Sequence, residues 1–257
     1  MAGCWMPVFS ALAVLPADTL AQKDILLVKE ILKKLEPLIR EREASSTLAT
    51  LTFDELYAPL NEKEAQFLRE FQGLDAQALN VKIPFRGMAT GQEPLTKIAG
   101  QKIRYTNIQD GATRPLGVQY LPQHVYEKYR DMMTAMQKDT GRHLLIESGY
   151  RSSAYQLYLF VYYLKNHGYS IRETVKFVAL PGYSEHGSPA HQAVDFINTD
   201  GINGEYNVKE FEELPEYRWL LEHAGEFGFV LSYPKTAQNG ITYEPWHWRL
   251  DAPGGET

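Results

Sequence analysis

Residues 184–196 constrain the fold of this chain more than any other stretch. They carry His186, His191 and Asp195, side-chain types that bind divalent zinc in proteins. Some fifty residues further on, Glu244 and His247 add another carboxylate and another imidazole. The ligands of one metal ion lie within a few ångströms of one another. A metal site built from these side chains therefore requires a fold that brings the two segments together.

The residues from Gln192 to Ile197 alternate in the manner of a β-strand, with Asp195 on one face and Val194 and Phe196 on the other. If the strand began at His191, that side chain would lie about 13 Å from Asp195 along the same face. Two atoms bound to one zinc are about 4 Å apart at most. His186, carried back by a turn, is therefore the better partner for Asp195, and we expect His191 to lie outside the metal site.

Glu244 and His247 are three residues apart and would face opposite ways on a straight strand. Pro245 favours an extended conformation for Glu244 and predicts a bend before His247. Such a bend would let Glu244 fold over a metal held by His247. A carboxylate in that position suits a general base that takes a proton from water and passes it to a leaving amine.

The sequence pattern of the N-terminal third predicts helices. Residues 18–44 carry an apolar stripe at alternating spacings of three and four, with Asp18 as the expected N-cap. The stripe continues for only about two heptads, which favours packing within the protein over a coiled coil. Asn61 and Glu64 match a capping box at the start of a second helix.

Residues 80–117 are rich in Gly and Pro, and we expect a connector with short strands such as Lys102–Tyr105. This region could position the enzyme, cover the cleft or bind a partner.

The C-terminal half mixes helices and short strands. Pro122 is expected in the first turn of a helix that Gly141 ends, with a methionine-rich stripe facing the core. Further helices are expected at residues 153–166, 171–179 and 215–227. Strands are expected at 143–147, 192–197, 229–231 and 246–250, with a turn at Asn239–Gly240. The order predicts an α+β fold with a small, mainly antiparallel sheet flanked by helices, preceded by a helical N-terminal region. We place the domains at residues 1–115 and 116–257.

The composition of the chain limits which partners it can bind and in which compartments it can work. The formal net charge of −6 argues against a nucleic-acid partner. No apolar run reaches the length of about 20 residues that a transmembrane helix needs. The single cysteine, Cys4, excludes an intramolecular disulfide framework. Residues 1–4 resemble the end of a bacterial lipoprotein signal, if translation starts upstream; the alternative is an ordinary start with a half-buried thiol. The oligomeric state stays open.

Several motifs in order give a more specific indication. They are residues 148–152 (Ser-Gly-Tyr-Arg-Ser), Ser184 and His186 leading to Ala193 and Asp195, and residues 243–249 around His247. Together they resemble the VanY-type D-alanyl-D-alanine carboxypeptidases, of the zinc metallopeptidase group that includes lysostaphin and the hedgehog signalling domain. The resemblance covers roughly residues 117–250.

The resemblance implies a zinc ion, one per chain, held by His186, Asp195 and His247. It implies Glu244 as the general base and Arg151 as the side chain that holds the C-terminal carboxylate of the peptide. A guanidinium suits this task because it donates two parallel hydrogen bonds to a carboxylate. Two further residues are expected to support substrate contacts: Ser184 and Gln156. The implied reaction removes the terminal D-alanine of a peptidoglycan stem peptide or precursor. The implied location is the bacterial cell envelope, in the periplasm or as a membrane-anchored lipoprotein, with the cytoplasm as the alternative.

One departure accompanies this resemblance. The family usually has seven positions from the histidine to the aspartate, whereas nine separate His186 from Asp195, with His191 where a glycine is expected. A loop longer by two residues could absorb the difference, with His191 facing substrate or hydrogen-bonding a ligand. The alternatives are an L,D-carboxypeptidase, an endopeptidase, and a non-catalytic zinc-containing cell-wall-binding module. Glu244 and Arg151 argue against the module, and Arg151 favours an exopeptidase.

Overall fold

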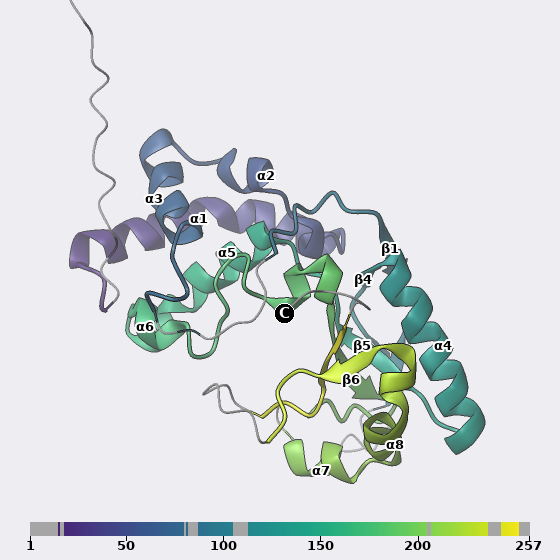
Figure 1. Cartoon of the computed structure of the whole chain (residues 1–257). Coiled ribbons are helices and arrows are strands. Elements are labelled where there is room, and N and C mark those ends of the chain that lie inside the picture. Colours follow the sequence, from purple (N-terminus) through teal and green to yellow (C-terminus); the bar gives the residue numbers. More distant parts are fainter. Residues whose placement is uncertain are drawn as a thin grey trace, which may run out of the picture.

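The computed structural model describes residue 15, residues 18–79, residue 81 and residues 87–104, 113–204, 207–235 and 243–251. Two sequence predictions, the lipoprotein-like Cys4 and the Asn239–Gly240 turn, lie outside these ranges. The described chain forms a helical layer beside an α+β layer (Figure 1). Within the described ranges, no helix combines the length and the apolar character needed to cross a bilayer.

The central sheet has four antiparallel strands in the order β5-β6-β8-β7. Their bounds are β5 (Leu144–Ser148), β6 (Ala193–Asn198), β7 (Phe229–Leu231) and β8 (His247–Leu250). In the register of this sheet, Asp195 pairs with Ser148 on one side and with His247 on the other. Directly paired residues of neighbouring strands project from the same face. The expectation of a small antiparallel sheet is confirmed, and its register places Asp195 and His247 side by side.

One face of the sheet packs against helices. The helices of this layer are α4 (Gln123–Thr140), α7 (Val208–Glu213), α8 (Pro215–His223) and the 3-10 turn η5 (Ala224–Phe227). The expected methionine stripe of α4 is buried against Val194, Phe196 and Trp248. Gly141 ends α4 in the left-handed conformation, as the sequence predicts. The start of α4 differs from the prediction. Pro122 is the last residue of strand β4 (Gln119–Pro122) and the N-cap of α4, so it lies just before the first turn of this helix.

The helical layer contains α1 (Gln22–Ala44), η1 (Leu48–Thr50), α2 (Phe53–Tyr57) and α3 (Glu62–Gln72). These elements share a hydrophobic core with α5 (Ser153–Tyr163), η2 (Leu164–His167) and α6 (Ile171–Thr174), as Figure 1 shows at the upper left. The N-terminal region thus packs on helices that follow β5 in the sequence. The capping box of Asn61 and Glu64 is confirmed.

Two further helix boundaries differ from the prediction. Asp18 is not an N-cap, since α1 begins at Gln22 after Ala21, which has no side-chain cap. The reason is that the chain before α1 pairs with another segment: Thr19 bridges Ser170, and the Leu20 N–H donates to the Tyr169 carbonyl at 3.0 Å. Helix α6 ends at Thr174 and does not extend to residue 179.

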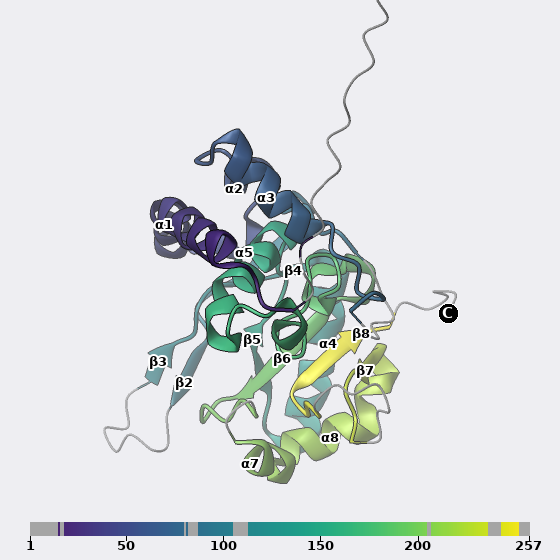
Figure 2. The same ribbon diagram turned by 90° about the vertical axis from the view of Figure 1, so that its left-hand side faces the viewer.

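Short elements connect the two layers. β1 (Leu95–Ile98) pairs with β4, and β2 (Lys102–Arg104) pairs with β3 (Thr113–Pro115), so the connector holds the short strands that were expected. Figure 2 shows β2 and β3 projecting from the body of the molecule. Two single-turn helices precede β6: η3 (Glu185–Gly187) and η4 (Pro189–His191). They accommodate the long step from His186 to Asp195.

Candidate metal centre

Three side chains meet at the face of the sheet that is turned away from α4. They are His186 on η3, Asp195 on β6 and His247 on β8, and each offers a ligand atom within 4.8 Å of the other two. His186 Nε2 lies 3.2 Å from Asp195 Oδ2, and His247 Nδ1 lies 2.8 Å from Asp195 Oδ1. The histidine ring planes are nearly perpendicular, at 87°. The structure therefore brings together the three side chains that the sequence singles out.

Local backbone contacts position His186. The Arg151 N–H donates to the His186 carbonyl at 2.9 Å, which ties η3 to the turn after β5. A side chain at Gly187 would bring its Cβ within 3.0 Å of the Arg151 carbonyl oxygen, so this approach favours glycine. His191 ends η4 and is not part of an extended strand, and its Nδ1 lies 3.6 Å from Asp251 Oδ1. It contributes no atom to the three-residue cluster.

The second nitrogen of each histidine ring has its own partner. His186 Nδ1 lies 2.8 Å from the Gly149 carbonyl oxygen, which can only accept a hydrogen bond. His247 Nε2 lies 3.0 Å from Glu185 Oε2. With a cation at the cluster, these contacts would keep the ring protons on His186 Nδ1 and His247 Nε2, so that His186 Nε2 and His247 Nδ1, which face Asp195, would be the ligand atoms. Metal-binding histidines usually make an outer hydrogen bond of this kind.

Glu185 was missed by sequence reasoning. Its side chain is 1% exposed, and its carboxylate oxygen Oε1 lies 3.7 Å from Arg249 Nη1. The local sequence places Glu185 beside His186, but the structure shows its carboxylate contacting His247, 62 residues away. In the sequence, the position of Glu185 next to His186 would suggest a contact with His186, whereas its carboxylate contacts His247.

Burial and charge act against each other in this cluster. Burial raises the pKa of Asp195, but the two imidazoles outweigh it and hold that pKa far below its usual value. Burial lowers the pKa of His186, and the Asp195 carboxylate offsets this only in part. Burial also lowers the pKa of His247, yet the carboxylates of Asp195 and Glu185 raise it to about 10. The cluster therefore attracts a positive charge, either a proton or a bound cation.

The donor set fits zinc. Two imidazole nitrogens and one carboxylate oxygen are common zinc ligands, and three protein ligands are the number that catalytic zinc sites use. The outer hydrogen bonds of both rings are made within the protein, so the fold itself orients the ligand atoms. A single-turn helix and two paired strands carry the three groups, which gives the site a stable frame.

Glu244 lies at the edge of this cluster. Its Oε2 is 3.8 Å from His247 Nδ1, and its side chain is 29% exposed. The expected bend at Pro245 is present, with the His247 N–H donating to the Glu244 carbonyl at 3.2 Å before β8 begins. Glu244 is thus a solvent-accessible carboxylate next to the nitrogen that faces the metal position.

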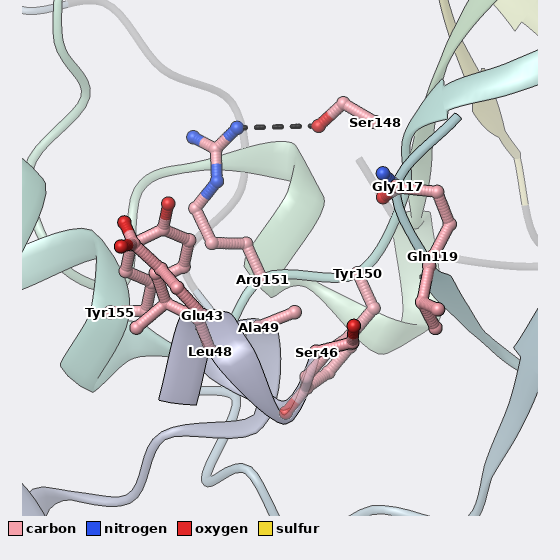
Figure 3. A pocket seen from close by; sticks show the side chains of 11 residues that line it. Glu43, Ser46, Leu48, Ala49, Gly117, Gln119, Ser148, Tyr150, Arg151 and Tyr155 are labelled. Atoms are coloured by element: carbon pink, nitrogen blue, oxygen red, sulfur yellow. Dashed lines mark hydrogen bonds between the residues drawn. The ribbon is translucent and has the colours of Figure 1, made fainter. Parts of the chain in front are cut away.

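Arg151 is held on the other side of the cluster. Its Nη1 donates to Gln156 Oε1 at 2.9 Å, and its Nη2 lies 3.4 Å from Ser148 Oγ (Figure 3). The buried Gln156 also donates to the Ala179 carbonyl at 2.7 Å, so both ends of its amide are used inside the protein. Ser184 is buried as the residue before η3. These contacts favour a supporting role for Gln156, whereas Arg151 lines a cavity.

The fold and the donor set define a metallohydrolase-type centre on an α+β scaffold. Residues 118–252 match the model of the family VanY, D-alanyl-D-alanine carboxypeptidase, and the chain belongs to that family. The expectation drawn from the sequence motifs is therefore confirmed.

Relatives with curated names are similar over the same half of the chain. A D-alanyl-D-alanine carboxypeptidase of Enterococcus faecium is 33% identical over 133 residues, covering 51% of this chain and 37% of the relative. One of Enterococcus faecalis is 37% identical over 129 residues, covering 47% of this chain and 44% of the relative. The chain thus spans less than half the length of these two relatives.

Solved structures are similar as well. The LD-carboxypeptidase LdcB aligns with a TM-score of 0.46 and 25% identity, covering 62% of this chain and 70% of LdcB. A mutant of the vancomycin resistance D,D-pentapeptidase VanY, from a VanB-type resistance cassette and in complex with Zn(II), aligns with a TM-score of 0.42 and 24% identity. That alignment covers 68% of this chain and 89% of the other.

Proposed function

We propose that this protein is a zinc-dependent D-alanyl-D-alanine carboxypeptidase that removes the C-terminal D-alanine of peptidoglycan stem peptides. The observation that carries the proposal is the convergence of His186, Asp195 and His247 with Glu244 beside them. Membership of the VanY family supports the reaction and the substrate class. We also propose residues 116–257 as the metallopeptidase domain, preceded by residues 1–115.

The proposed mechanism assigns one task to each group. Zinc held by His186, Asp195 and His247 would supply Lewis acidity, which activates water and polarises the scissile carbonyl. Glu244 takes the proton from the attacking water and delivers it to the leaving amine. Its contact with solvent lets it exchange protons between turnovers.

Arg151 positions the substrate by donating hydrogen bonds to the terminal carboxylate. Gln156 holds the guanidinium through its 2.9 Å hydrogen bond. A group that binds a free carboxylate favours an exopeptidase over an endopeptidase. Peptides of this kind occur in the bacterial cell envelope, and we propose that compartment as the site of action.

The test is incubation of the zinc-loaded protein with pentapeptide stems, tetrapeptide stems and a cross-linked pair of stems, followed by mass spectrometry of the products. Release of one D-alanine from the pentapeptide supports the proposal. Cleavage of the tetrapeptide alone would indicate an L,D-carboxypeptidase, and cleavage inside a cross-bridge would indicate an endopeptidase. Zinc binding without release of any residue would indicate a binding module and contradict the proposal.

A further inference from the structure

A cavity of about 290 Å³ opens beside Arg151 (Figure 3). Ser148 also lines this cavity, and Ser148 is the strand partner of Asp195. The cavity therefore adjoins the metal centre on the side where Arg151 is held. Its volume is at the lower limit of ligand pockets, which hold drug-sized molecules from about 300 Å³ upwards. One small residue fits this space better than a longer peptide does.

One wall of the cavity comes from the N-terminal region. Four residues from the end of α1 to η1 line it: Glu43, Ser46, Leu48 and Ala49. All four lie outside the family match, which begins at residue 118. In Figure 3, Glu43 lies beside Tyr155 on one side of Arg151, whereas Gln119 lies on the opposite side. The cavity is thus shared between the family domain and a segment that precedes it.

Hydrogen bonds connect this wall to the turn that carries Arg151. The Ser152 N–H donates to the Ala49 carbonyl at 2.8 Å, and Ser152 Oγ donates to the Leu51 carbonyl at 2.5 Å. Ser152 is fully buried. The Tyr120 hydroxyl donates to the Ser46 carbonyl at 2.9 Å. Because a buried polar group that loses its hydrogen-bond partner destabilises the fold, these contacts hold the wall against the Arg151 turn.

Building on the proposed function, we propose that residues 43–49 form one wall of the subsite that receives the C-terminal residue of the substrate. If Arg151 holds the terminal carboxylate, the side chain on the same carbon lies within a few ångströms of the guanidinium and enters this cavity. Ala49 then limits the size of that side chain, because a well-packed pocket rejects added methylene groups. Glu43, an exposed carboxylate at the rim, disfavours a second negative charge on the substrate.

The size limit is tested with Ala49→Leu and peptides that differ only in a terminal glycine, D-alanine or D-leucine. We expect kcat/KM to fall about tenfold or more for D-alanine and D-leucine, and less than about twofold for glycine. Ala44→Leu is the matched control, since Ala44 is an exposed residue at the end of α1 outside the cavity lining. An equal loss on all three peptides, or none, would overturn the size limit.

The charge limit is tested independently with Glu43→Lys, which changes an exposed side chain and spares the fold. The ratio of kcat/KM for a D-glutamate terminus to that for a D-glutamine terminus should rise about threefold or more at low salt. It should return toward the wild-type ratio at 1 M salt, where the Debye length is about 3 Å. Glu41→Lys, on the same helix but outside the cavity lining, should leave the ratio unchanged. If Glu43→Lys and Glu41→Lys gave the same ratio of kcat/KM values, Glu43 would not be part of the subsite.

The two proposals can fail separately. If the zinc-loaded wild type releases no residue from any peptide, the proposed function fails. In that case, calorimetric titration of the same peptides into the zinc-loaded proteins still tests the subsite proposal. Ala49→Leu should weaken the binding of each peptide more, the larger its terminal side chain is. If the wild type is active and Ala49→Leu shows no dependence on size, only the subsite proposal fails.

Discussion

His247 Nε2 lies 3.0 Å from the buried Oε2 of Glu185, while Nδ1 of the same ring lies 2.8 Å from Asp195 Oδ1. The ring is thus held between two carboxylates, one facing the cluster and one behind it. This arrangement fixes which nitrogen is available to a metal. It also makes Glu185 the expected positioning residue of a candidate ligand, His247, that is far away in the sequence.

Replacing Glu185 with alanine should weaken zinc binding about 10- to 100-fold, because the outer partner of a metal-binding histidine orients the ring and raises its basicity. Competition with a chromophoric chelator measures the affinity. Glu222→Ala removes a carboxylate whose side chain is 74% exposed and should have no effect. Circular dichroism must show that the Glu185 variant is folded. Unchanged affinity in a folded variant would exclude the positioning role.

Glu244→Gln should keep one zinc per chain and lose turnover, with kcat lower by about 10²- to 10⁴-fold. The amide keeps the shape of the side chain but cannot take a proton from water. Metal content by mass spectrometry and steady-state kinetics test the two halves of this expectation. Glu210→Gln, at an exposed position on α7, is the control. Substantial turnover in the Glu244 variant would assign the base to another group.

Arg151→Ala should reduce kcat/KM at least about 10- to 100-fold on peptides with a free terminal carboxylate, since the loss of even one of its two hydrogen bonds to a charged group has an effect of this size. Peptides with an amidated C-terminus should show a much smaller change, since they lack the charge that the guanidinium binds. Arg130→Ala alters a side chain that is 61% exposed and serves as the control. Equal losses on both kinds of peptide would count against carboxylate recognition.

The ion pair between Lys34 and Glu64 should make stability depend on pH. Lys34 Nζ lies 2.7 Å from Glu64 Oε1, and this hydrogen bond lowers the pKa of Glu64 below its ordinary value of 4.5. A carboxyl group with a depressed pKa in the folded state stabilises the fold above its unfolded pKa and loses that contribution as pH falls through the folded value.

Glu64→Gln removes the charge and keeps a residue that can complete the capping box with Asn61. The wild type should therefore exceed this variant in free energy of unfolding at pH 7, and the difference should shrink below pH 4.5. Urea unfolding at both pH values provides the measurement. A difference that grows as the pH falls would have the wrong sign for this ion pair.

Short-range patterns predict much of the local structure. The Asn61 capping box, the Gly141 helix end and the methionine stripe of α4 depend on residues within a few positions, and all three are present. Asp18 failed as an N-cap because a contact with Ser170, far away in the sequence, sets the path of the chain before α1. Local propensity is outweighed where long-range pairing decides.

By itself, the sequence of this protein determined the candidate ligands, the strand carrying Asp195 and the family, because residue type, spacing and motif order are properties of the chain alone. Only the tertiary structure decided that Asp195 pairs with His247, that Glu185 orients His247 and that Ala49 faces the cavity of Arg151. The physical reason is that these relationships join side chains separated by tens of residues. Sheet register and the packing of α1 and η1 determine their distances, and no local pattern encodes either one.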